Sequence, residues 1–239
     1  MKGKSISLLK ALTREQLLGN YTKLSSYVTL YILIHFTINN IVLSINIGGI
    51  LAGMVAGLLG HLLISLFTVG FIRVCIKVIR GSEPNIGDFF YVLKHDPDKI
   101  IIISSVLWVF SELVILPLYI PSSFGAALGM SRGALIFVRC LLVSVFIVLY
   151  IYAHILLGQC YFIYFDHPEF TSSQIFEMSI NIMRNNKGRY FYLLFNAACM
   201  ILLMIVTLGI GIYWMLPYMF GLMTNFYDDV KVESLEYLV

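Results

Sequence analysis

The chain has 239 residues, of which 59% are hydrophobic and 12% are charged, and its formal net charge is +3. A soluble domain cannot hide so much apolar surface, so the composition excludes the soluble classes and predicts an integral membrane protein. The small positive charge is spread along the chain, with no basic patch interleaved with aromatics. It therefore suits anionic lipid headgroups and argues against nucleic acid as a partner.

Six stretches are apolar enough to cross a hydrocarbon core of roughly 30 Å, for which about 20 residues are needed. They cover residues 24–47, 49–72, 100–120, 133–165, 190–207 and 212–227. The pattern predicts an all-α fold: a polytopic membrane helical bundle with six transmembrane helices in three hairpins, and residues 1–239 as a single integral membrane domain. The last two stretches are short, which leaves open whether the last hairpin spans fully.

Lys and Arg residues gather on one side of this pattern. Only Arg132 and Arg139 fall on the other side, and the remaining fourteen of the sixteen precede the first stretch, follow the last, or lie in the two even-numbered connections. Loops rich in Lys and Arg stay in the cytoplasm. We therefore expect a multi-pass protein of a bacterial plasma membrane with its amino and carboxyl termini in the cytoplasm.

Three amphipathic segments precede the three predicted hairpins. They cover residues 6–18, 86–93 and 172–183, where apolar side chains recur at helical spacing. Such cytoplasmic elbow helices commonly lie in the headgroup plane, and neighbouring cations contact phosphate. The candidate headgroup contacts are Lys10, Arg14, Lys94, Arg184 and Lys187. The elbows either brace the bundle or serve a regulatory or partner-docking role.

Glu112 and Arg139 are charged residues inside predicted membrane spans. A charge at the bilayer centre costs at least about 2.5 kcal/mol, so each needs a stabilising partner. Counting residues along the two helices places them at similar depths. We predict an ion pair that locks the helices together, since each charge offsets the other's desolvation. Two alternatives stay open: a ligand or proton site, or an Arg139 that snorkels outward beside a protonated Glu112.

His35, Asn39 and His61 also fall near the predicted midplane and extend this polar cluster. With Glu112 they make a set whose chemistry is that of metal ligands. Their spacing matches no metal motif, however, so hydrogen bonds between helices are the favoured interpretation. We predict neither a metal nor a cofactor.

Catalytic patterns are lacking in the sequence. It contains no Gly-x-Ser-x-Gly elbow and no phosphate-binding loop. The four cysteines are not spaced as Cys-x-x-Cys, and we expect free thiols. The sequence therefore does not predict an enzyme.

Several motifs resemble an uncharacterised bacterial membrane-protein family, domain of unknown function 975. They are Leu-Phe-Thr-Val-Gly-Phe at 66–71, Arg-Gly-Ser-Glu-Pro at 80–84, the segment 178–188, Thr-Leu-Gly-Ile-Gly-Ile-Tyr-Trp-Met-Leu-Pro-Tyr at 207–218, and Phe-Tyr-Asp at 226–228. Ser82 departs from the family pattern as an insertion between Gly81 and Glu83. The resemblance implies a polytopic plasma-membrane protein, of Gram-positive origin, and implies no activity.

Two classes of function remain. The favoured one is a non-enzymatic binding or accessory module for a lipid, an amphipathic peptide or a membrane-protein partner, in an envelope stress or self-protection role. The alternative is a small-molecule or lipid transporter with a polar intramembrane cavity around Glu112. Intramembrane charges are few, and clear Gly or Pro interruptions at midplane are missing, which weakens the transporter interpretation. Small residues such as Gly53, Gly57 and Gly60 would also permit a homo-oligomer.

Overall fold

The structure is a computed structural model that describes residues 3–45, 50–119, 129 and 131–236. All the regular elements in these residues are helices. The all-α fold class predicted from hydropathy is therefore confirmed for the part of the chain that the structure describes.

The amino-terminal part forms three helices: α1 (Ile6–Leu17), α2 (Tyr21–Ile45) and α3 (Ile50–Ile79). Ser5 begins α1 as an N-cap, where its side chain accepts a hydrogen bond from the Leu8 backbone. The predicted spans 24–47 and 49–72 fall on α2 and α3. Helix α3 continues seven residues past the predicted end, because Val74 and its neighbours are buried in the core and prolong the apolar packing.

The middle part begins with two one-turn helices, α4 (Ile86–Phe89) and α5 (Tyr91–Lys94), where a single helix over 86–93 was predicted. An Asn85–Asp88 capping box starts α4, and Phe90 leaves helical geometry between the two. Helix α6 (Pro97–Ile115) then runs into a 3-10 turn, η2 (Leu116–Tyr119). Together they cover most of the predicted span 100–120, whose last residue lies outside the described residues.

The predicted long span 133–165 is two helices, α8 (Arg132–Leu157) and α9 (Cys160–Asp166), separated at Gly158 and Gln159. A Cβ on Gly158 would lie 2.2 Å from the hydroxyl oxygen of Tyr190, so only glycine allows this close approach. Helix α10 (Ser172–Met183) follows with the predicted bounds and begins at a Thr171–Gln174 capping box.

The carboxyl-terminal part consists of α11 (Lys187–Val206) and α12 (Ile212–Glu236). Gly209 turns the chain between them with a φ of 86°. Helix α12 extends beyond the predicted 212–227, because Val230 is buried and keeps the helix packed past that point.

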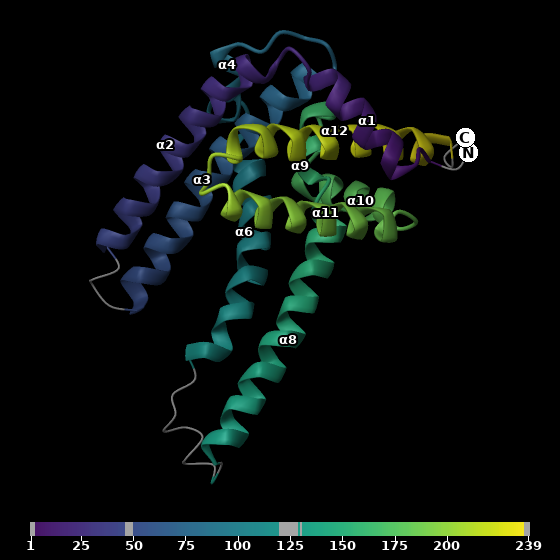
Figure 1. The fold of residues 1–239 in the computed structure, drawn as a ribbon. Coiled ribbons are helices and arrows are strands. Elements are labelled where there is room, and N and C mark those ends of the chain that lie inside the picture. The colour runs from purple at the N-terminus through teal and green to yellow at the C-terminus, as the bar shows by residue number, and fades with distance from the viewer. Residues whose placement is uncertain (1–2, 46–49, 120–128, 130, 237–239) are drawn as a thin grey trace.

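Figure 1 shows the arrangement of these helices. The hairpins α2–α3 and α6–α8 diverge from a common packed end, and α11 and α12 run across α6 and α8 in this view. The core lies at the common end, where α1, α3, α4, α9, α10 and α12 each contribute large buried side chains. Examples are Leu9, Phe71, Phe89, Ile163, Ile175 and Phe226.

Five of the described helical stretches are long and apolar enough to cross a membrane: Tyr21–Ile45, Ala52–Ile79, Pro97–Leu118, Arg132–Asp166 and Lys187–Val206. This finding indicates a membrane protein. Helix α12 is not among the five, so the described helices do not reach the predicted six, and the six-span count stays a prediction.

Candidate functional site

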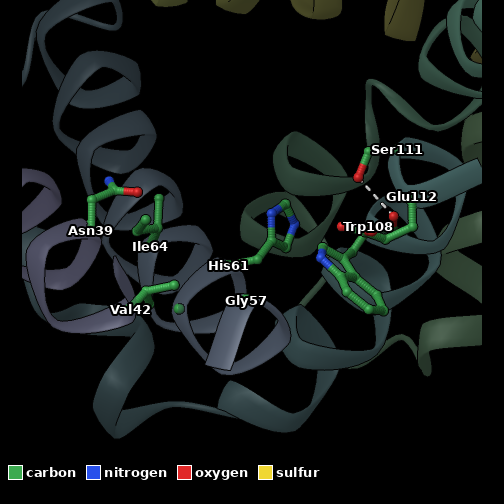
Figure 2. A pocket seen from close by; sticks show the side chains of 9 residues that line it. Asn39, Val42, Gly57, His61, Ile64, Trp108, Ser111 and Glu112 are labelled. Carbon is green, nitrogen blue, oxygen red and sulfur yellow. Dashed lines mark hydrogen bonds between the residues drawn. The ribbon is translucent and has the colours of Figure 1, made fainter. Parts of the chain in front are cut away.

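A pocket of about 260 Å³ lies between α2, α3 and α6. Figure 2 shows it from close by, with His61 projecting between the α2 side chains and those of α6. Its lining residues are Asn39, Val42, Gly57, Gly60, His61, Ile64, Trp108, Ser111 and Glu112. The structure thus brings together Asn39, His61 and Glu112, three of the five residues singled out from the sequence as an intramembrane polar cluster.

Asn39 is oriented by its own helix. Its side-chain nitrogen lies 2.8 Å from the backbone oxygen of His35 and 2.8 Å from the His35 Nδ1 atom. The amide donates both hydrogens when the His35 proton is on Nε2, because Nδ1 then accepts. His35 itself is exposed and does not line the pocket. It therefore acts on the pocket through Asn39.

Two glycines on α3 shape the same wall. A Cβ on Gly60 would lie 2.4 Å from Val42 Cγ2, so α2 and α3 come together here only because position 60 lacks a side chain. A Cβ on Gly57, one turn away, would meet nothing within 4 Å. The first glycine brings the helices together, and the second leaves room in the pocket.

Helix α6 supplies the opposite wall. The Ser111 hydroxyl donates to the backbone oxygen of Trp108 over 2.7 Å, which ties that side chain to its own helix. Glu112 is half-buried beside it. A carboxylate, an imidazole and an amide therefore meet against Val42, Ile64 and Trp108, an arrangement able to accept and donate hydrogen bonds within an apolar surround.

Arg139 does not line this pocket. The ion pairs of the described residues do not include one between Glu112 and Arg139, and Arg139 has another interaction. Glu112 faces α3 across the pocket, whereas Arg139 lies on α8. The helix-locking pair of Glu112 and Arg139 therefore stays a prediction.

The five cations predicted to contact headgroups lie on α1 and α5, at the end of α10 and at the start of α11. Lys10 Nζ donates to Asn196 Oδ1 over 2.6 Å, and Lys187 Nζ donates to the Tyr152 hydroxyl over 3.1 Å. Lys94 lines a second pocket of about 240 Å³ at the start of α6. Arg14 lies in the last turn of α1, and Arg184 ends α10 on an exposed site. The proposed contact of these residues with lipid stays a prediction.

A four-residue ionic cluster that was not predicted from the sequence joins the end of α3 to α9 and α12. Arg80 donates to Asp166 Oδ1 over 2.7 Å and to Asp228 Oδ1 over 2.6 Å, and Lys231 donates to Asp166 Oδ2 over 2.7 Å. Burial lowers the pKa of Arg80, but its bonds to Asp166 and Asp228 outweigh that effect and raise the pKa above its ordinary value. Two carboxylates neutralise two cations. The cluster, which we call the clamp, holds the end of α3, α9 and α12 together. The only sequence signal was that Arg80 and Asp228 both fall in the family motifs.

A smaller ionic group lies nearby on α3 and α4. The Asp88 carboxylate accepts from Arg73 Nε over 3.2 Å and from Lys77 Nζ over 2.9 Å. Burial raises the pKa of Asp88, but hydrogen bonds from Lys77, the Asn85 backbone and Arg73 outweigh it and hold the pKa below its ordinary value. We call the end of the molecule that holds Arg73, Lys77, Arg80, Asp88, Asp166 and Asp228 the charged end.

The described residues form neither a metal site nor a disulfide. No group of three or more His, Cys, Asp or Glu side chains is arranged there to hold a metal ion. The four cysteines are free thiols, with Cys75 and Cys160 buried and Cys140 and Cys199 exposed.

Comparison with known proteins places the chain in one family. A family model with the description "Protein of unknown function (DUF975)" matches residues 1–234, and this confirms the resemblance carried by the motifs. No curated protein and no solved structure matches the chain.

Proposed function

Because the chain belongs to the DUF975 family of proteins of unknown function, we propose its role from its own geometry: a non-enzymatic binding module for an amphipathic ligand. We place it in a bacterial plasma membrane with both termini in the cytoplasm, following the distribution of Lys and Arg. The ligand is a lipid, an amphipathic peptide or a segment of a membrane-protein partner. An envelope stress or self-protection role fits such a module.

The observation that carries this proposal is the meeting of Asn39, His61 and Glu112 in one pocket. Polar side chains in a membrane-spanning region are costly, and by default they indicate a functional site. These three come from three different helices, so the fold rather than one local motif brings them together. A carboxylate and an imidazole there suit a ligand whose polar end carries an amine or hydroxyl.

The apolar surroundings fit the other end of such a ligand. Val42, Ile64 and Trp108 line the pocket beside the polar group, and the lipid-facing sides of α2 and α3 begin next to it, where Leu43, Leu59 and Leu63 are exposed. A ligand with a polar head and an apolar tail would satisfy both chemistries at once. A purely polar solute would leave the apolar wall without a partner.

Binding is favoured over catalysis by the hydrogen bonds in the pocket. Ser111 supplies the hydroxyl in the lining, and it donates to the backbone of Trp108 and not to His61. A serine nucleophile needs a base within hydrogen-bond reach. The geometry thus supports recognition of a ligand without a chemical step.

Transport is the second candidate, and it rests on the same Glu112. Passage of a solute across the membrane would need the pocket to open toward the charged end as well. There, the continuation of α3 is tightly packed, with Val69, Phe71 and Val74 fully buried. This packing favours a pocket that opens on one side only, as a binding module requires.

A matched pair of asparagines provides the test. Native mass spectrometry of the protein released from its own membrane would score a bound companion in the wild type, in Asn39→Ala and in Asn40→Ala. Asn39 lines the pocket, whereas the side chain of the neighbouring Asn40 is exposed and donates to the Phe36 backbone oxygen. We expect a stoichiometric companion whose affinity falls about tenfold in Asn39→Ala, because one hydrogen bond to the ligand is lost, and is kept in Asn40→Ala.

Glu112→Gln extends this test to the alternative. The binding proposal predicts lower occupancy and no flux of small molecules into liposomes for the wild type. A bare wild-type protein, or equal occupancy in both asparagine variants, would contradict binding in this pocket. Flux through the wild type that Glu112→Gln abolishes would establish transport instead.

A further inference from the structure

The two ends of the described chain lie side by side. The Lys4 backbone nitrogen donates to both carboxylate oxygens of Asp229 over 3.1 Å, and Arg189 donates to the Lys4 backbone oxygen over 2.7 Å. Helices α1 and α12 run next to each other, as Figure 1 shows. Ends that touch lie on the same side of a membrane, so the number of complete crossings between them is even.

Helix α12 is poorly suited to be one of these crossings. Its second half carries Asn225, Asp228, Asp229 and Lys231, and charges at the bilayer centre are costly. The part before Asn225, residues 212–224, is about 20 Å long at 1.5 Å per residue, less than the roughly 30 Å of a hydrocarbon core.

The partner of α12 is a polar face of α1. Asn225 donates to Thr13 Oγ1 over 2.9 Å and to Gln16 Oε1 over 2.7 Å. These bonds hold α12 against α1, and Lys4, just before α1, bonds to Asp229 of the same α12. Helix α12 therefore belongs with α1, outside the hydrocarbon core.

Helix α11 must then start and finish on the same side. Its 20 residues are apolar enough to cross, but a crossing by α11 without a return by α12 would separate the two termini. Figure 1 shows α11 running across α6 and α8 and not alongside them. The remaining candidates, α2, α3, α6 and α8, give an even number of crossings.

We propose that α11 lies along the membrane surface with its exposed apolar face in the lipid acyl chains, so that four helices cross and the last hairpin is interfacial. The exposed face is large. Its members are Phe191, Phe195, Leu202, Leu203, Ile205 and Val206, each more than half exposed. Leu208, in the turn that follows, is 92% exposed.

The cations at the edge of this exposed face indicate that lipid covers it. Lys10 lies 5.3 Å from the Tyr192 ring centroid, and Lys187 lies 5.1 Å from that of Tyr152, so both cations border α11 at its polar edge. Basic residues beside an exposed apolar stripe fit anionic headgroups above acyl chains. Arg184, which is exposed at the end of α10, lies three residues before Lys187 in the chain.

Site-directed labelling distinguishes this arrangement from a spanning hairpin. Cys140 and Cys199 are replaced by Ser, because they are exposed, while the buried Cys75 and Cys160 stay. Single cysteines are then placed at Ile210, in the last turn, at Ser44 and Arg132, near the far ends of the crossing helices, and at Arg184. A membrane-impermeant maleimide is applied to intact cells, to inverted vesicles, and to detergent-dissolved protein as the measure of full labelling.

We expect Ser44→Cys and Arg132→Cys to react from one side and Arg184→Cys from the other. Ile210→Cys should react from the Arg184 side, or only after detergent. Labelling of Ile210→Cys from the Ser44 side would mean that the hairpin crosses, and it would overturn the proposal.

A second variant tests the occupant. Phe195→Cys lies on the exposed face of α11. A spin label there should be accessible to oxygen dissolved in the lipid. It should show no coupling to a label on a second copy. Stoichiometric disulfide crosslinking of Phe195→Cys to a second copy would assign the face to protein and overturn lipid as its partner.

Discussion

Arg80 Nη2 lies 2.6 Å from Asp228 Oδ1, although 148 residues separate them in sequence. The same guanidinium contacts Asp166, so one side chain joins α3, α9 and α12 at the charged end. These contacts fix where the last helix sits relative to the two hairpins that hold the candidate pocket between them.

Arg80→Ala should lower the stability of the protein by about 1–3 kcal/mol, because Asp166 and Asp228 lose their shared partner. The Arg80 side chain is 35% exposed, so the cost stays below the 3–5 kcal/mol typical of a fully buried pair. Thermal unfolding in one detergent would measure the change. Arg132→Ala, an exposed control at the far end of α8, should leave the midpoint unchanged; an equal drop in both variants would show that the clamp is not stabilising.

Gly70→Ala should destabilise the protein by about 3 kcal/mol or more, at the upper end of overpacking effects. The added Cβ would lie 1.9 Å from the Phe89 backbone oxygen, and a backbone atom cannot move aside as a flexible side chain can. Gly57→Ala on the same helix is the control, since its Cβ meets nothing, and it should gain up to about 1 kcal/mol in helix propensity. Equal unfolding midpoints for the two variants would refute the close packing of α3 on α4.

Stability should fall in acid as Asp88 becomes protonated. The folded pKa of Asp88 is lower than its unfolded value, so its contribution is fully present above the unfolded value, about 3.9, and is lost as the pH falls through the folded value. Unfolding midpoints between pH 7 and pH 2.5 would follow this loss. Asp88→Asn should be less stable at neutral pH and should show a shallower acid decline; an unchanged acid profile would mean that Asp88 is not the titrating group.

Asn225→Ala should cost about 1–2 kcal/mol, because the fully buried Thr13 and its neighbour Gln16 lose a donor. Asn40→Ala, which removes an exposed amide bonded within its own helix, should stay within about 0.5 kcal/mol of the wild type. Limited proteolysis of the segment that precedes α2 should rise only in Asn225→Ala. Unchanged protection would argue that α1 is held by its apolar contacts alone.

Much of the fold follows from the sequence, because apolar length and period determine each helix separately. The predicted segments 24–47 and 172–183 fall on α2 and α10 for this reason. The close approach of the Tyr190 hydroxyl to Gly158, at the break between α8 and α9, was not predicted, since Tyr190 comes from another helix. Nothing near Gly158 in the sequence reveals that contact.

In the candidate site, too, the sequence predicts the position along each helix but not the contacts between helices. Residue counting places Asn39, His61 and Glu112 at comparable depths, and the structure has them around one pocket. Counting cannot give the direction of a side chain around its helix axis, so it decides neither which residues face one pocket nor whether Glu112 pairs with Arg139. The contact between Arg80 and Asp228 depends on the tertiary fold alone, so no local pattern could have predicted it.

Photocrosslinking from two adjacent positions tests the central claim, that this pocket holds an amphipathic ligand, most directly. A photoreactive amino acid at Ile64 would face the pocket, and one at Leu63, which is 47% exposed, would face bulk lipid. We predict a discrete adduct from position 64 that is absent at position 63 and is lost in Glu112→Gln. The same adducts from both positions, unaffected by Glu112→Gln, would contradict the account.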